Sequence, residues 1–216
     1  MKESLASLGI NAQGNILRNL KPDELIKKAL EIEDARLSNT GALVVTTGKF
    51  TGRAPKNRFF VSHDKYHNEI CWCDNNLPIE KEKFDELYEK ITSYLSKKDE
   101  LFVFDGIAGA HSECGMNIRI VNEFASQNLC AYNMFIRIKD EKLDGFNPDF
   151  TVLTAPSLKA EGIEGEAAIC INLEKKVVII LGSKYAGEIK KSIFTIMNFL
   201  LPYKKVLPMH CAANMD

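Results

Sequence analysis

The sequence lacks the features of several large classes of protein. Its apolar runs are far too short to span a bilayer, and its first residues lack the apolar core of a signal peptide. It has no internal repeat, low-complexity tract or long linker. A net charge of -1 gives no general attraction to nucleic acid or to an anionic membrane surface. We therefore expect no nucleic-acid or membrane partner, and any anion site must come from locally clustered charge.

Cysteine is present but is not arranged as a disulfide framework. The six cysteines form no C-x-x-C pair, and 216 residues with 45% hydrophobic content can bury a core without disulfide bonds. The simplest expectation is a reducing compartment, the cytoplasm.

Two histidines and two cysteines make the most obvious candidate for a zinc site. The residues are His63, His67, Cys71 and Cys73. Their types suit zinc, but the spacing H-x3-H-x3-C-x-C is not a usual ligand pattern. Apolar residues alternate with the two cysteines, which is typical of a strand that buries one face. We therefore favour a strand over a zinc site.

Strand-like and helix-like segments interleave along the chain without strict alternation, which predicts an α/β fold, a mixed sheet with flanking helices. The first twenty residues are mixed and polar and predict no element. The expected helices cover residues 22–32, 81–95, 123–134 and 189–201. The expected strands cover residues 42–47, 59–61, 100–105, 117–121, 150–153, 167–171, 176–182 and 206–210.

The stretch YAGEIKK, residues 185–191, lies between a β-branched strand-like run and an apolar-periodic helical run. Lys190 and Lys191 therefore fall in the first turn of a helix, where the partial positive charge of the helix end favours Glu188 but disfavours lysine. Crowded positive charge lowers the pKa of a lysine, and a neutral amine can bind a metal or act as a base. A functional lysine and an ordinary solvated pair both stay open from these residues alone.

A basic loop with two glycines and three threonines covers residues 46–58. Its cations are Lys49, Arg53, Lys56 and Arg58. Arginine can bind a carboxylate or phosphate through two parallel hydrogen bonds, and glycine lets backbone N–H groups approach an anion. No G-K-[ST] closes the loop, so it is not a P-loop. An anion site and a basic surface turn are both compatible with this composition.

Two other places offer less specific chemistry. His210 ends an apolar run, and imidazole is a common metal donor, although a lone histidine is more often structural. Asp105, His111 and Glu113 lie beside two glycines near the expected end of a strand, where α/β folds place ligands.

Taken together, four segments resemble ATP-dependent phosphoenolpyruvate carboxykinase. TGKFTGRAPK (residues 47–56) resembles the family's T-G-x-x-T-G-R-S-P-K, and NMFIR (residues 133–137) resembles its N-M-F-I-R. YAGEIKK matches Y-A-G-E-[IM]-K-K, and residues 201–214 resemble L-L-P…M-H-C-S-A-N. The resemblance runs in order from about Leu8 to the last residue, and four ordered motifs are far more specific than any one of them.

The resemblance implies a role for five residues. Arg53, Tyr185 and Lys191 would bind the carboxylate-bearing substrate. Lys191 and His210 would be ligands of a catalytic Mn²⁺ (or Mg²⁺) and would contact the ATP. Lys190 would supply positive charge for an enolate or phosphoryl oxygen. The implied catalytic residues are thus Lys190, Lys191 and Arg53.

The implied activity is the lyase reaction of gluconeogenesis, in which oxaloacetate and ATP give phosphoenolpyruvate, CO₂ and ADP. Decarboxylation leaves an enolate that needs a metal and fixed cations close by, and the enolate oxygen then attacks the γ-phosphoryl group. The implied fold is that of the family's amino-terminal domain. We expect residues 1–204 to form the substrate-side domain and residues 205–216 to form the first strand of a missing nucleotide-binding domain.

Several positions depart from the family patterns. Ala54 and Ala212 stand where serine is usual, Asn57 and Arg58 replace an acid and a lysine, and Asp216 stands where glycine is usual. The family's phosphate-binding loop, G-x-x-G-x-G-K-T, and the aspartate that completes its metal site would lie beyond the last residue. We therefore expect a fragment that is inactive alone and whose partner would be the missing carboxyl-terminal half.

Two other hypotheses stay open. One is a stand-alone module that binds dicarboxylates or other anions without catalysis. The other is a remnant that does not fold stably, with residues 206–216 as an unpaired edge. Melting experiments with oxalate and manganese would separate these two, because a ligand that binds only the folded state raises the melting point.

Overall fold

The computed structural model describes residues 1–62 and 65–211. A nine-stranded sheet has the order β1-β6-β7-β9-β11-β10-β4-β5, with the short β8 paired to β6. Its strands are β1 (Asn15–Arg18), β4 (Arg58–Val61), β5 (Leu77–Ile79), β6 (Glu100–Ala108), β7 (Met116–Asn122), β8 (Ile136–Arg137), β9 (Phe150–Ala155), β10 (Ala168–Asn172) and β11 (Val177–Leu181). A separate hairpin is formed by β2 (Ala35–Leu37) and β3 (Leu43–Val45).

The sheet is mixed, as the interleaved pattern predicted. The pairs β1–β6, β7–β9, β9–β11, β10–β4 and β4–β5 are parallel. The pairs β6–β7, β6–β8 and β10–β11 are antiparallel. The expected α/β class with flanking helices is therefore confirmed.

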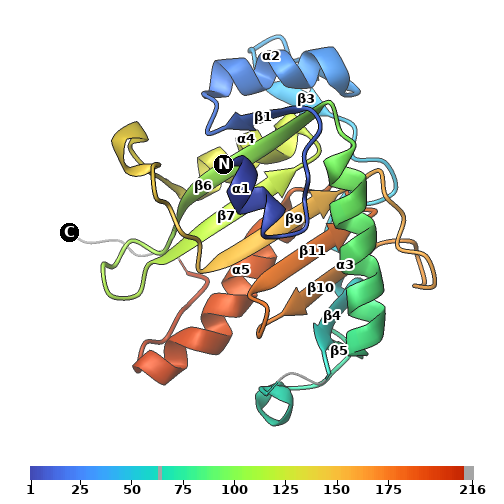
Figure 1. Cartoon of the computed structure of the whole chain (residues 1–216), viewed down its shortest axis with the longest axis vertical. Coiled ribbons are helices and arrows are strands. Elements are labelled where there is room, and N and C mark those ends of the chain that lie inside the picture. Colours follow the sequence, from blue (N-terminus) through green and yellow to red (C-terminus); the bar gives the residue numbers. More distant parts are fainter. Residues whose placement is uncertain (63–64, 212–216) are drawn as a thin grey trace.

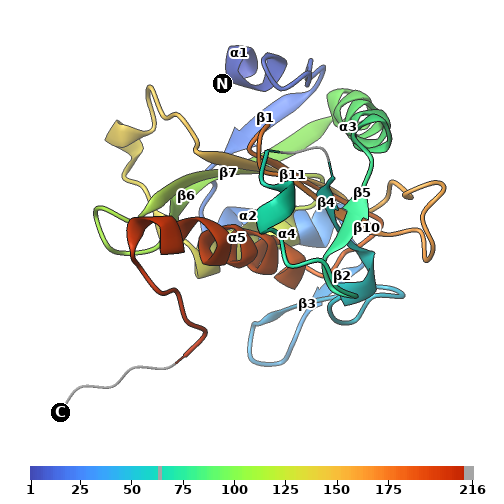
Figure 2. The same ribbon diagram turned by 90° about the horizontal axis from the view of Figure 1, so that it is seen from below.

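Helices cover both faces of the sheet. One face carries α1 (Lys2–Ala6) and α3 (Lys81–Ser96), and the other carries α2 (Pro22–Ile32), α4 (Ala125–Met134) and α5 (Gly187–Leu200) (Figures 1 and 2). Short 3-10 turns lie at Pro55–Asn57, His67–Glu69, Asp140–Lys142 and Leu201–Lys204. In the described part of the chain, no helix has the length and apolar character needed to cross a membrane.

Alternate side chains of the central strands build two separate cores. In β11, Ile179 and Leu181 pack on the α3 side, whereas Val178 and Ile180 pack on the α5 side. All four are buried, because helices cover both faces of this strand. Two-sided burial is the physical reason for the uninterrupted apolar run in the sequence.

The first twenty residues hold more structure than their composition suggested. They contain α1, whose Leu5 is fully buried, and β1, which pairs in parallel with β6. Both elements are too short and too polar to show a periodic pattern. Their stability comes from tertiary pairing and burial, which a local pattern does not report.

The strand expected at residues 206–210 is not formed. After the last 3-10 turn, Lys205 takes a left-handed backbone conformation with φ 59°, and the Val206 N–H bonds the Leu201 carbonyl at 3.1 Å. The described chain beyond that point pairs with no strand, and Leu207 and Met209 are 76% and 65% exposed. A strand needs a partner for its backbone groups, and this segment leads away from the sheet (Figure 2). The proposed boundary after residue 204 stays a prediction.

Candidate functional site

The stretch YAGEIKK lies where β11 turns into α5, as the sequence predicted. Gly182 ends the strand with φ +69°, and a Cβ atom there would lie 2.1 Å from the Glu166 carbonyl oxygen. Only glycine fits this close approach of two backbones. The start of α5 is therefore fixed relative to the sheet by the backbone itself.

Buried amides hold the same turn from the α4 side. The Gln127 side-chain NH₂ donates to the carbonyl oxygens of Ser183 and Lys184, both at 3.3 Å, and its oxygen accepts from the Thr154 hydroxyl at 2.8 Å. The Asn122 amide donates to the Thr154 hydroxyl at 2.9 Å. This network ends one residue before Tyr185, and no spacing in the sequence pointed to it.

Tyr185 lies against the first residue of α5. A Cβ atom on Gly187 would lie 2.4 Å from the Tyr185 ring and 2.9 Å from its hydroxyl oxygen. The absence of a side chain on Gly187 therefore allows the half-buried tyrosine to rest on the helix start. The glycine of the motif has a steric purpose that its position in the sequence did not reveal.

The basic loop is tied to the same helix turn by a long-range hydrogen bond. The backbone N–H of Ala54 donates to Oε1 of Glu188 at 2.7 Å, across 134 residues of sequence. Glu188 is 4% exposed, whereas Arg53, next to the contact, is exposed. The substitution of serine by Ala54 does not affect this bond, because the donor is backbone. Arg53 and the first turn of α5 are thus brought together.

Arg58 is occupied with structure. Its guanidinium donates to the Asn75 carbonyl at 2.7 Å, to the Asn76 side chain at 2.8 Å and to the Thr195 hydroxyl at 3.1 Å. Burial lowers the pKa of Arg58, and the positive charge of Arg53 lowers it further. Arg58 therefore joins β4 to α5, and Arg53 is next to the Ala54 N–H that bonds the helix start.

Lys191 and His210 meet at one aromatic ring. The Lys191 Nζ lies 5.9 Å from the centre of the Phe194 ring, and the His210 ring lies 5.8 Å from it in an edge-on arrangement. Lys191 is half-buried and His210 is exposed. Phe194 is half-exposed and lies near both implied metal ligands.

Lys190 also lies near the Phe194 ring, but in different surroundings from Lys191. It lines a hollow of about 170 Å³ whose other walls are mostly apolar and include Phe135, Phe194 and Met197. Phe135 belongs to the NMFIR segment, so this motif lies close to the start of α5. Residues three and four apart on a helix share a face, which places Lys190 and Lys191 on the two sides of Phe194.

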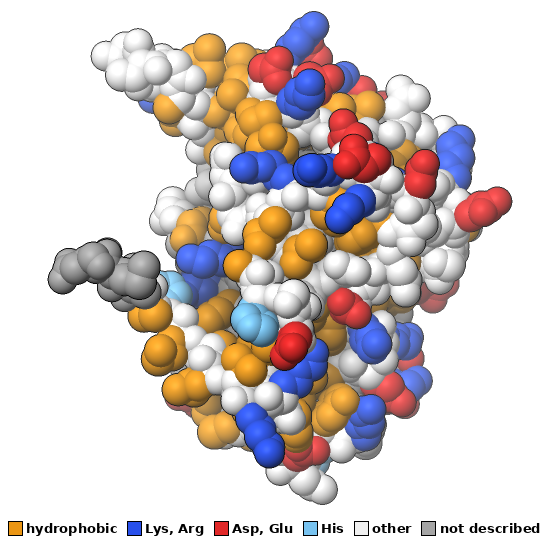
Figure 3. Space-filling view, turned by 90° about the vertical axis from the view of Figure 1, so that its left-hand side faces the viewer, with side chains coloured by type: hydrophobic (Ala, Val, Ile, Leu, Met, Phe, Trp, Pro, Cys, Tyr) orange, Lys and Arg blue, Asp and Glu red, His pale blue; other side chains and the backbone are white. Residues whose placement is uncertain are grey.

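The cations of this group form no ion pair within the described part of the protein. There, Arg53, Lys190 and Lys191 take part in no hydrogen bond or ion pair, unlike Arg18, Arg58 and Arg119 elsewhere. Figure 3 shows Lys and Arg side chains lying among hydrophobic ones on one side of the molecule. Unpaired cations on one surface are suited to an anionic ligand.

The suggested zinc cluster finds no support in the described residues. They contain no group of three or more His, Cys, Asp or Glu side chains that could hold a metal. Cys71 and Cys73 are exposed, and the expected strand is wrong, because only an isolated bridge between Cys73 and Asn76 forms. His63 lies outside the described residues. All six cysteines of the chain are unpaired.

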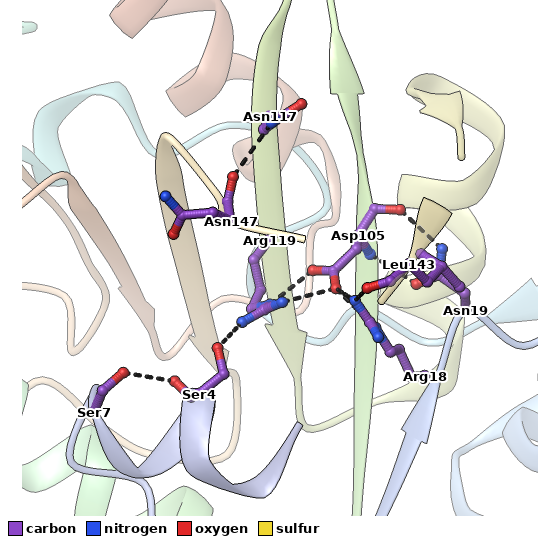
Figure 4. A network of polar contacts seen from close by, with 9 residues as sticks. All are labelled: Ser4, Ser7, Arg18, Asn19, Asp105, Asn117, Arg119, Leu143 and Asn147. Carbon is purple, nitrogen blue, oxygen red and sulfur yellow. Dashed lines mark hydrogen bonds and ion pairs between the residues drawn. The ribbon is translucent and has the colours of Figure 1, made fainter. Parts of the chain in front are cut away.

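The cluster around Asp105 is structural. Asp105 lies inside β6, not at a strand end, and accepts from Arg119 at 2.7 and 2.8 Å and from Arg18 at 2.8 Å (Figure 4). Arg119 also donates to the Ser4 hydroxyl, so the network fastens α1 to the sheet. Asp105 and Arg119 are almost completely buried and mutually satisfied. A charged pair of this kind has no group left for a ligand.

Comparison with known proteins agrees with the motifs. The family model described as phosphoenolpyruvate carboxykinase matches residues 14–216. The phosphoenolpyruvate carboxykinase (ATP) of Fusobacterium nucleatum is 48% identical over 216 residues, which is 98% of this chain and 41% of that protein. Phosphoenolpyruvate carboxykinase (ATP) 1 of Moorella thermoacetica is 48% identical over 215 residues, with the same two shares. The Geobacillus kaustophilus enzyme is 48% identical over 195 residues, 88% of this chain and 37% of that protein.

The chain therefore spans about 41% of the length of these relatives. The match to the family model nevertheless extends over nearly the whole chain and includes the loop of Arg53 and the stretch YAGEIKK. On this basis the chain belongs to the ATP-dependent phosphoenolpyruvate carboxykinase family and corresponds to the amino-terminal portion of its members.

Proposed function

We propose that this chain is the substrate-side part of a phosphoenolpyruvate carboxykinase that converts oxaloacetate and ATP into phosphoenolpyruvate, CO₂ and ADP in the cytoplasm. The observation that supports it most is the bond between Ala54 and Glu188, since it sets Arg53 beside the helix turn of Lys190 and Lys191. Arg53, Lys190 and Lys191 would then share one surface with Tyr185. A dicarboxylate is the ligand that such a group would bind.

Each residue would act on a different part of the substrate. Arg53 would bind a carboxylate through its two parallel donors. Tyr185, seated on Gly187, would orient the substrate through its hydroxyl. Lys190 would neutralise the negative charge that develops as CO₂ leaves and as the phosphoryl group is transferred. The protein's contribution is thus positioning and charge, without a covalent step.

Lys191 and His210 fit part of a metal site. Both lie against Phe194, and a neutral amine and an imidazole are suitable nitrogen donors for a divalent cation. Bound there, Mn²⁺ or Mg²⁺ would polarise the substrate carbonyl as a Lewis acid. Two donors do not fill the coordination shell, so oxygen atoms of substrate, ATP or water would complete it.

Thermal melting of the purified chain with oxalate and Mn²⁺ tests the proposal. We expect a rise of roughly 5–10 °C at a ligand concentration near 100 times Kd, because binding stabilises the folded state by about 2.7 kcal/mol. Arg53→Ala should remove most of this rise. Lys97→Ala, an exposed lysine just after α3 on the opposite face, is the matched control and should retain it. An equal rise for Arg53→Ala and the parent chain would refute the assignment.

Turnover is a separate expectation. The printed sequence contains no G-x-x-G-x-G-K-T loop, so we expect no formation of phosphoenolpyruvate from oxaloacetate and ATP by this chain alone. Detection of that product would contradict it. A stand-alone anion-binding module would also bind without turnover, and the nucleotide sequence that follows codon 216 separates the two.

A further inference from the structure

The loop that presents Arg53 has few attachments to the rest of the protein. In the described structure, residues 47–53 form no hydrogen bond with any other residue. Neither Gly48 nor Gly52 has a neighbouring atom near the position of a Cβ. The first anchored group after this stretch is the N–H of Ala54, which bonds Glu188. Phe50 and Ala54 pack against the core on the α5 side, and the bond one residue away is the polar contact nearest to Arg53.

Glu188 is well placed to serve as that anchor. It lies in the first turn of α5, where the helix dipole favours a carboxylate. It is 4% exposed, and the nearby positive charge of Arg58 acts on it. A buried carboxylate with a charge-assisted hydrogen bond of 2.7 Å is a strong contact. The loop and the helix turn should therefore move as one unit.

We propose that Glu188 is a positioning residue for dicarboxylate binding, which holds Arg53 at a fixed place relative to Lys190 and Lys191. It does not touch the substrate and acts only through the backbone at Ala54. The inference rests on the proposed function, since it concerns the same anion site. It adds that the loop and the helix form a single preorganised surface before ligand arrives.

Two substitutions of Glu188 separate the effect of side-chain length from the effect of charge. Glu188→Asp keeps the charge but is one methylene shorter, so it should not reach the Ala54 N–H. Glu188→Gln keeps the reach and an accepting oxygen but loses the charge. Calorimetric titration of the full chain with oxalate in Mn²⁺ should give a Kd weakened about 5- to 10-fold for Asp and within about 3-fold of the parent for Gln. The opposite order would overturn the proposal.

A double-mutant cycle identifies the residue through which Glu188 acts. Arg53→Ala should weaken oxalate binding by at least 10-fold, and Glu188→Asp should then add less than 2-fold, because the loop has lost the group that it positions. If Glu188→Asp weakens oxalate binding as much in the Arg53→Ala background as in the parent chain, the positioning role is refuted. If Arg53→Ala alone binds as tightly as the parent, the proposed function itself fails, and this outcome is distinct from the previous one.

Glu123→Ala is the matched control. Glu123 is also a buried carboxylate that accepts from a backbone N–H, that of Ser157 at 3.0 Å, but it faces α3. Its substitution should lower the melting temperature and leave the oxalate Kd unchanged. If Glu123→Ala weakens binding as much as Glu188→Asp does, the effect is general destabilisation and the positioning role is rejected.

Discussion

Gly182 and Gly187 determine how the chain enters α5. The first permits a close approach to the backbone at Glu166, and the second leaves space for the ring of Tyr185. Gly187 explains why a charged motif contains a glycine, because a side chain there would displace the ring of Tyr185. At the scale of single residues, the geometry of this turn depends on two positions that are occupied by glycine.

Gly187→Ala tests this steric account. The added methyl group would overlap the Tyr185 ring, so we expect oxalate affinity in Mn²⁺ to fall about 10-fold, measured by calorimetric titration. Alanine is the better helix former, so the melting temperature should stay the same or rise slightly. An unchanged affinity would show that the ring position is irrelevant to binding.

The sequence predicted the charged residues of this site better than their supports. Arg53, Tyr185 and Lys191 could be singled out from the sequence, because each of them lies in one of the ordered motifs. Arg58 and Gln127 were not, because their partners lie in distant segments, and no local spacing encodes such contacts. The roles of the motif residues stay predictions until binding is measured.

At the scale of elements, α4 supports the β11–α5 turn through buried amides. Gln127 and Asn128 project from α4, and the Asn128 amide donates to Asn122 at 2.8 Å. With Thr154 they form a fully buried polar layer between α4 and the sheet. Every bond in such a layer matters, because an unpaired polar group is costly away from water.

Gln127→Ala should therefore be strongly destabilising. It leaves the carbonyl oxygens of Ser183 and Lys184 and the Thr154 hydroxyl without this partner, and we expect the free energy of unfolding to fall by about 2–4 kcal/mol in urea titration. Asn198→Ala, which removes an exposed amide from α5, should cost less than about 0.5 kcal/mol. Similar losses for both variants would contradict the importance of the buried layer.

Long periodic elements and the short strands β3 and β4 were predicted from the sequence, and several other short elements were not. The apolar faces of α3 and α5 and the buried run of β11 appear at the expected positions. β1, β2 and β5 have three or four residues each and depend on neighbours for their stability. The strand predicted at residues 206–210 was wrong for the opposite reason. Its apolar run resembles a strand, but no strand lies beside it to pair with.

At the scale of the whole molecule, Glu123 links the helix layer of α3 to the sheet. It accepts from the Tyr94 hydroxyl at 2.7 Å, from the Lys98 amine at 2.8 Å and from the Ser157 N–H at 3.0 Å. Burial raises the pKa of its carboxyl, but these hydrogen bonds outweigh burial, and the pKa lies below its ordinary value.

This shift has a defined consequence for acid stability. A carboxyl whose pKa is depressed on folding adds stability above its unfolded pKa, near 4.5, and loses it as the pH falls through the lower folded value. Glu123→Gln should therefore cost about 1–3 kcal/mol at pH 7, and the difference from the parent should shrink below about pH 4. Denaturant titrations at several pH values would check this, and a constant difference would contradict it.

The bond between Ala54 and Glu188 also sets the order in which the protein can mature on the ribosome. Its two ends are 134 residues apart, so at 5–20 residues per second the loop emerges on the order of ten seconds before its anchor. The parallel partner of β4 is β10, which is also made after the loop. A nascent chain therefore exposes Arg53 on an unfastened loop until α5 has been made, and the proposed anion-binding surface can form only after that point.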